Sequence, residues 1–268
     1  HVAEVVLPAL CKRCLATDLR ARHGAALMVA ELTLALAAGE HIAGNSSVLR
    51  EGLVTDLQAI VPAVEKARLY RGRGGEVMRA AACRVLEYCA RARLPSTGRA
   101  QAKLVSTTIA ECLQHPSEHI SRAAAAALEA VAGVYLDTPV AAKNARLGDK
   151  FAKILVTDDN AAATRGAALA LAALPRWQLW PFGDQVVASL LEAARLPEDV
   201  ARRDPETRRN AVRALAAVVC TIGIAPPLQA EVEAAEASEG AAVAGDEDSP
   251  AAEGAPAPAD GAGGSGSS

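Results

Sequence analysis

Two residue pairs in the sequence have the spacing of metal ligands. Cys11 and Cys14 form a CxxC pair, and His115 and His119 lie four residues apart. A structural zinc site needs four ligands, and no second pair follows Cys14 at the spacing of a zinc finger. Pro116 stands between the two histidines, so His115 is expected to precede the helix that contains His119. We interpret both pairs as structural residues and predict no metal and no other cofactor.

A glycine-rich segment is the most distinctive candidate for binding an anion. The stretch Tyr70-Arg-Gly-Arg-Gly-Gly-Glu-Val-Met-Arg79 precedes a predicted helix, whose free amides could hold a phosphate group. It lacks the Lys-Ser/Thr of a P-loop and follows a predicted helix instead of a strand. A turn that lets two helices approach closely is the first interpretation, and a loop that contacts a partner is the second. No Ser/His/Asp order or GxSxG elbow is present, so we do not expect an enzyme.

A fixed interval separates four arginines of the sequence. They lie 43 residues apart, each with an alanine three positions later: Arg79 with Ala82, Arg122 with Ala125, Arg165 with Ala168, and Arg208 with Ala211. A fifth copy, Arg22 with Ala25, stands 57 residues before the first, and we assign the excess to a loop at residues 39–47. Intervals of about 40–47 residues are typical of HEAT and armadillo repeats, which bury their apolar faces by stacking. The interval predicts an all-α solenoid of about five helix pairs.

Apolar periodicity and proline positions divide the chain into these pairs. First helices are expected at 2–15, 47–68, 97–114, 138–156 and 182–195, and second helices at 19–38, 74–93, 118–136, 159–174 and 204–223. In three copies an acid precedes the repeated arginine by four residues, namely Asp18, Glu118 and Asp204. Such a pair suits the start of a helix, so we interpret the arginine first as a structural residue paired with this acid. Exposed pairs contribute only about 0.3–0.5 kcal/mol, so packing must hold the stack.

The composition is that of an all-helical chain. It is 51% hydrophobic but only 3% aromatic, because the apolar residues are mostly alanine, leucine and valine. The apolar runs are too short or too alanine-rich to predict a membrane span, and no signal-peptide pattern begins the chain. The cysteines fit a reduced, cytosolic protein. Helical patterning that starts at Val2 suggests a fragment of a longer array.

Charge divides the chain into two parts. Residues 229–268 carry nine acids and no base, whereas the preceding residues hold 22 acids and 28 bases. The tail is nearly all Ala, Gly, Pro, Ser, Glu and Asp, which cannot bury enough apolar surface to fold. We therefore predict a HEAT-like segment at 1–227 and a disordered acidic tail at 228–268. The body lacks the dense basic stripe and the aromatics that nucleic acid requires.

Four ordered motifs resemble one known family. They are Arg22-His-Gly-Ala with Glu31, Leu69-Tyr-Arg-Gly-x-Gly-Gly75-x-x-Met-Arg79, Arg165-Gly-x-x-Leu-Ala-Leu-x-x-Leu-Pro175, and Pro197-Glu-Asp-Val200 before Thr207-Arg-Arg209. In this order they resemble the C-terminal half of tubulin-folding cofactor D, over about residues 17–222. After Pro227 that family continues with further helical repeats, whereas this chain turns acidic.

The resemblance implies a cytoplasmic, cytoskeleton-associated chaperone of HEAT type. Such a protein binds β-tubulin after the chaperonin, joins the other tubulin-folding cofactors, and helps to activate GTP hydrolysis by tubulin during heterodimer assembly. It also binds a small Arf-like GTPase. On the matched motifs, we predict partner contacts at Arg22, His23, Tyr70, Arg71, Gly74 and Gly75.

Two other classes of function remain open from the sequence. A generic HEAT adaptor, such as a phosphatase scaffold or a transport receptor segment, would show the same 43-residue interval without the glycine-rich string. An enzyme that holds a phosphate group at the glycine-rich turn is the third alternative. Binding of nucleotide by the chain would distinguish it from the other two.

Overall fold

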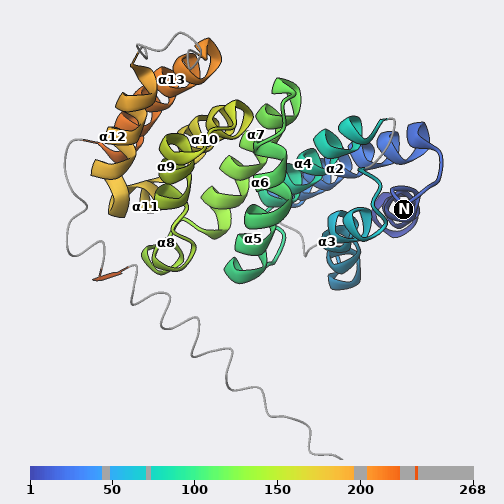
Figure 1. Cartoon of the computed structure of the whole chain (residues 1–268). Coiled ribbons are helices and arrows are strands. Elements are labelled where there is room, and N and C mark those ends of the chain that lie inside the picture. Colours follow the sequence, from blue (N-terminus) through green and yellow to red (C-terminus); the bar gives the residue numbers. More distant parts are fainter. Residues whose placement is uncertain (44–48, 71–73, 196–203, 224–232, 235–268) are drawn as a thin grey trace, which may run out of the picture.

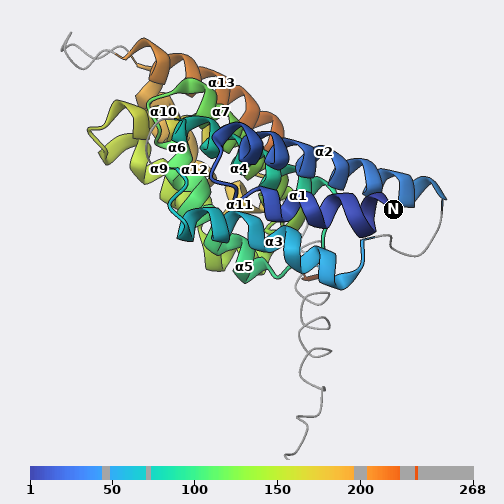
Figure 2. The ribbon, with the colours of Figure 1, turned by 90° about the vertical axis from the view of Figure 1, so that its right-hand side faces the viewer.

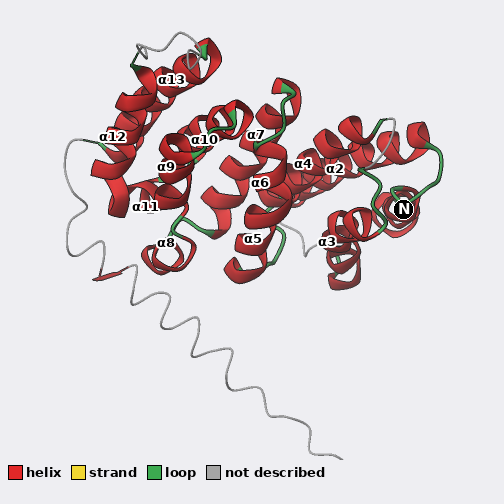
Figure 3. Ribbon diagram, viewed as in Figure 1, coloured by secondary structure: helices red, strands yellow, loops and turns green. Residues whose placement is uncertain are grey.

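The computed structural model describes residues 1–43, 49–70, 74–195, 204–223 and 233–234 (Figure 1). Within these ranges the regular structure is helical throughout, and the described part of the chain contains no strand (Figure 3). Alanine and leucine lose little side-chain freedom in a helix, which explains how a chain with so few aromatic residues builds this fold.

The helices alternate between two layers, as first and second members of five pairs. The first members are η1 Val2–Val6 with α1 Leu7–Arg13; α3 Glu51–Lys66; α5 Gly98–Leu104 with η2 Val105–Ile109 and α6 Ala110–Leu113; α8 Pro139–Ala145 with α9 Leu147–Thr157; and α11 Arg176–Leu179 with η3 Trp180–Phe182 and α12 Gly183–Ala194. The second members are α2 Leu19–Ala43, α4 Gly75–Arg91, α7 Glu118–Tyr135, α10 Ala161–Ala173 and α13 Pro205–Ile222.

The second helices form one continuous layer. Helix α2 packs on α4, α4 on α7, α7 on α10, and α10 on α13, so the pairs follow one another along a solenoid (Figures 1 and 2). The alanine of each repeat lies inside this layer, buried in four copies and half-buried at Ala125. Small side chains at these positions let neighbouring helix backbones approach closely. The predicted class, a solenoid of HEAT or armadillo type with five helix pairs, is confirmed.

Three boundaries differ from the sequence-based expectation. Helix α2 continues to Ala43, so residues 39–43 of the expected loop are helical and residues 44–47 lie outside the described residues. The first helix of the fourth pair breaks at Arg146, which adopts a left-handed conformation with φ of 49°. The fifth pair begins at Arg176, ahead of the expected start at 182, because Pro175 precedes a short helix, α11, and the turn η3 joins α11 to α12.

Length and composition alone would let one described stretch, Leu19–Gly39, cross a membrane. This part of α2 is longer than the apolar runs expected from the sequence. In the fold, α2 packs against α1 and α4 and buries Val29 and Ala30, and 33% of the apolar window is buried. The acidic tail predicted at 228–268 lies outside the described residues, apart from 233–234.

Candidate functional site

The five repeated arginines lie at equivalent places in the second helices. Each follows the start of its helix by about one turn, and the second helices stack side by side in the same direction. The arginines therefore form a row along one edge of the solenoid, which we call the arginine row: Arg22, Arg79, Arg122, Arg165 and Arg208. The surroundings of this row decide whether it binds a partner or holds the repeats together.

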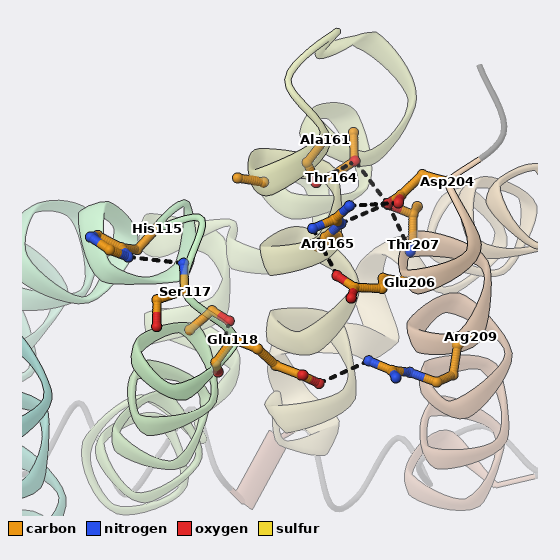
Figure 4. Close-up of polar contacts among 12 residues, drawn as sticks. His115, Ser117, Glu118, Ala161, Thr164, Arg165, Asp204, Glu206, Thr207 and Arg209 are labelled. Carbon is orange, nitrogen blue, oxygen red and sulfur yellow. Dashed lines mark hydrogen bonds and ion pairs between the residues drawn. The ribbon is translucent and has the colours of Figure 1, made fainter. Parts of the chain in front are cut away.

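Arg165 joins the fourth helix pair to the fifth (Figure 4). Its Nε and terminal nitrogen donate to the two carboxylate oxygens of Asp204 at 2.8 and 2.6 Å, and a second terminal nitrogen lies 2.7 Å from Glu206. The Asp204 carboxylate also caps α13 by accepting a hydrogen bond from the amide of Thr207. The Arg165 guanidinium holds the pKa of Asp204 well below its ordinary value. Arg165 is thus a cross-link between repeats.

Glu118 forms a second bridge across the same edge (Figure 4). It accepts hydrogen bonds from Arg122 within α7 and from Arg209 of α13, each at 2.8 Å. Arg122 and then Arg209 lower the pKa of this carboxyl. The carboxylate therefore joins the start of α7 to α13, two repeats away.

The remaining arginines of the row also bind within the fold. Arg79 lies over the ring of Tyr70, 5.1 Å from its centroid, and 3.6 Å from Glu111. The Nε of Arg208 donates to the carbonyl oxygen of Ala194 at 3.0 Å. These contacts support the structural interpretation of the repeated arginine.

The acid partner that the sequence predicted is correct in only one of three copies. Arg122 pairs with Glu118 as expected, but Asp204 binds the arginine of the preceding repeat instead of Arg208. Asp18 caps α2 by accepting a hydrogen bond from the amide of Ala21 at 2.8 Å. Both Asp18 and Asp204 accept hydrogen bonds from the free amides at the start of their own helices, as capping residues do.

The glycine-rich turn forms a tight joint between α3 and α4. Gly74 has a φ of 81°, and a Cβ atom there would lie 2.0 Å from Leu19 Cδ2 at the start of α2. A Cβ atom on Gly75 would lie 1.9 Å from the carbonyl oxygen of Tyr70. Glycine is therefore favoured at position 74 by its left-handed backbone and at position 75 by the close approach of the Tyr70 carbonyl, in line with the first interpretation of a glycine turn. Arg71 lies outside the described residues.

The structure brings the two predicted partner-contact motifs together. Leu19 touches the turn at Gly74, so Arg22 and His23 lie on the helix that borders it. Arg22 itself is only 8% exposed, and it donates to the carbonyl oxygen of Thr17 at 2.8 Å. Its guanidinium is thus engaged in the fold, while His23 is half-buried.

The candidate metal ligands have structural roles in the fold. Cys11 and Cys14 are buried free thiols, and burial raises the pKa of Cys11 to about 11 and that of Cys14 to about 12. His115 lies before α7, where its Nδ1 accepts a hydrogen bond from the amide of Ser117 at 3.1 Å. Over the described ranges, no group of three or more His, Cys, Asp or Glu side chains could hold a metal ion.

Two grooves open on the face formed by the first helices. The first groove, of about 510 Å³, lies between α3 and α5 over α4. The second groove, of about 490 Å³, lies between α5 and α8 over the end of α7. Sequence reasoning missed both. The available signal was the run of small residues in α5, because Gly98, Ala100 and Ala102 leave the space that larger side chains would fill.

Comparison with known proteins names no family for this chain. No protein-family model matches the chain. One similar solved structure is a designed armadillo repeat protein in complex with the peptide (KR)4, with 16% sequence identity, a TM-score of 0.42, and coverage of 91% of this chain and 93% of that one. Another is a computationally designed armadillo repeat protein for modular peptide recognition, with 17% identity, a TM-score of 0.41 and the same coverage. The stacked helix pairs of the structure itself define the chain as a helical repeat of armadillo or HEAT type.

Proposed function

We propose that this chain is a protein-binding scaffold that acts in tubulin folding, as a segment of a tubulin-folding cofactor D. The general role is supported by the stack of helix pairs, which offers a long surface to a large partner through many modest contacts. The tubulin role is supported by the ordered sequence motifs, of which the string at residues 69–79 is the most specific. In this role the chain binds β-tubulin together with other tubulin-folding cofactors and a small Arf-like GTPase, and contributes to GTPase activation of tubulin.

The turn at residues 70–75 carries the proposal. Its glycines are needed for packing, as the contacts of Gly74 and Gly75 show, and Tyr70 supports the ring contact with Arg79. Arg71 belongs to the same matched string and lies outside the described residues. We assign partner contact within this string to the Arg71 side chain.

A pull-down of β-tubulin, and separately of the αβ heterodimer, tests the proposal. The folded chain is expected to capture β-tubulin, and Arg71→Glu is expected to reduce capture at unchanged helical circular dichroism. Arg213→Glu, on an exposed position of α13, is the matched control because it makes the same charge change in the fifth pair. Capture that is equal for all three forms would refute the assignment of Arg71.

The alternative is a generic repeat scaffold for another protein. A helical chain that captures neither β-tubulin nor the heterodimer would exclude the tubulin role for these repeats. The scaffold architecture would stand, because it depends on the helix pairs and not on the partner. Affinity capture with a different bait would then be the next measurement.

A further inference from the structure

The two grooves leave a gap in the first-helix layer. In the fifth repeat this layer is closed, since α12 packs directly on α9. Between the second and third repeats α3 and α5 stand apart (Figure 1). The first groove lies between them, with α4 at its floor. A helix bound in the first groove would contact both α3 and α5. It would thereby take the place of a further helix in the first-helix layer.

The interior of the first groove is apolar. Leu57 and Val61 of α3 form one wall, Leu104 of α5 forms the other, and Val85 and Leu86 of α4 lie at the bottom. Tyr135 of α7 lines both grooves, and its hydroxyl is held by a hydrogen bond to the carbonyl oxygen of Leu94 at 2.7 Å. Such a floor fits the apolar stripe of an amphipathic helix.

The rims of the grooves carry unpaired bases. Lys66 and Lys103 stand on opposite walls of the first groove, and Arg99 stands at the second. All three side chains are exposed, and within the described part of the chain none of them forms an ion pair. The one acid among the linings, Glu65, accepts a hydrogen bond from the hydroxyl of Thr108 and keeps its negative charge. Three bases thus stand against one acid, so the net charge at the grooves is positive.

We propose that the first groove binds an acidic amphipathic helix of a partner protein, with apolar side chains on the groove floor and carboxylates beside Lys66 and Lys103. This inference rests on the proposed scaffold function and specifies its surface. The second groove continues the same surface on the other side of α5, so that Arg99 receives acids adjoining the helix. Two grooves in succession favour a protein segment over a single small molecule, and Tyr135 is the only aromatic residue among their linings, which disfavours nucleic acid.

Fluorescence anisotropy with designed peptides tests the proposal on the full chain. The probe is a labelled helical peptide with leucine at positions i, i+3, i+4 and i+7 and glutamate on its other face, and the comparison peptide has lysine in place of glutamate. The acidic peptide is expected to bind at least about tenfold more tightly, and its affinity is expected to fall as salt is added.

Two variants address the groove directly. Ala100→Trp places a large ring in the first groove at an exposed position and should abolish binding; Ala216→Trp, on an exposed position of α13, is its control. Lys66→Glu with Lys103→Glu should weaken binding of the acidic peptide by about tenfold or more, whereas Lys150→Glu on α9, outside both grooves, should not. Equal binding by Ala100→Trp and the unaltered chain would overturn the proposal.

Two further outcomes separate this inference from its alternatives. A variant with the nine acids of residues 229–268 changed to their amides tests the chain's own tail as occupant. If the peptide binds only to that variant, the tail is the occupant of the groove in the unaltered chain. This result would overturn the assignment to a partner. Capture of β-tubulin by Ala100→Trp, equal to that by the unaltered chain, would reject the groove as the tubulin surface while leaving the proposed function intact.

Discussion

Removing the charge of Asp204 should loosen the fifth helix pair. In Asp204→Asn, the amide oxygen can still cap α13, because Asn and Asp are equally good N-cap residues. What is lost is the two-point ion pair with Arg165, whose side chains are 32% and 21% exposed for Arg165 and Asp204. Exposed pairs contribute at most about 1 kcal/mol, and hydrogen bonds to charged groups about 1.5–3 kcal/mol. For this partly buried pair we expect about 1–2 kcal/mol.

A double-mutant cycle with Arg165→Met isolates that energy. The only tryptophans of the chain, Trp177 and Trp180, lie in α11 and η3 of the fifth pair, so their fluorescence reports on this pair while circular dichroism reports on all repeats. With a dependence of about 2 kcal/mol per molar urea, the fluorescence midpoint of Asp204→Asn should fall by roughly 0.5–1 M. Glu192 and Arg195, an exposed pair at 2.8 Å, serve as the control.

The coupling energy that this cycle measures should depend on pH in a defined direction. The pKa of Asp204 is lowered in the folded chain, so the pair stabilises the fold fully above the ordinary carboxylate pKa of about 3.9. The stabilisation is lost as the pH falls from there through the lowered pKa. A coupling energy at pH 7 no larger than that of the control pair, or one that does not diminish in acid, would refute the reasoning.

Three further changes test other contacts by urea unfolding. Gln178→Leu should destabilise the fold by about 2–4 kcal/mol, because the fully buried amide of Gln178 joins two backbone groups, one of them the carbonyl oxygen of Leu136 at 2.7 Å; an effect below about 1 kcal/mol would contradict this. Arg93→Gly should stabilise by about 0.5–1 kcal/mol, because Arg93 has a φ of 52° after α4; a loss of stability would argue against strain there. Gly166→Ala should cost at least about 2 kcal/mol, since the new Cβ would lie 2.1 Å from the carbonyl oxygen of Leu113. A neutral Gly166→Ala would mean that α10 can shift away from α6.

The repeat could be predicted from the sequence because stacking imposes a fixed interval on equivalent residues. Ala168 and Ala211 are buried since each faces the preceding helix of the same layer, and this position recurs whatever the partner. The partners of the arginines could not be predicted. Whether Asp204 meets Arg165 or Arg208 depends on the offset between adjacent helices, which the interval along the chain does not contain.

The candidate site could likewise be predicted from the sequence only in part. Glycine at positions 74 and 75 indicated a close approach, and the contacts with Leu19 and Tyr70 account for it. The grooves depend instead on what is missing between two first helices that are more than 30 residues apart in the sequence. The small residues of α5 can be read from the sequence. They line a cavity only because of where α3 and α4 lie in the fold.

The two layers of the solenoid therefore have different physical tasks. In the second-helix layer, neighbouring helices pack continuously, and polar bonds such as Arg165–Asp204 and Arg209–Glu118 join one repeat to another. In the first-helix layer, packing is interrupted beside α5, and the bases Lys66, Arg99 and Lys103 form no ion pair within the described residues. Because the second helices pack continuously along the whole stack, a partner in the first groove would leave the contacts between them intact. A ligand that bound at the arginine row would first have to displace those bonds.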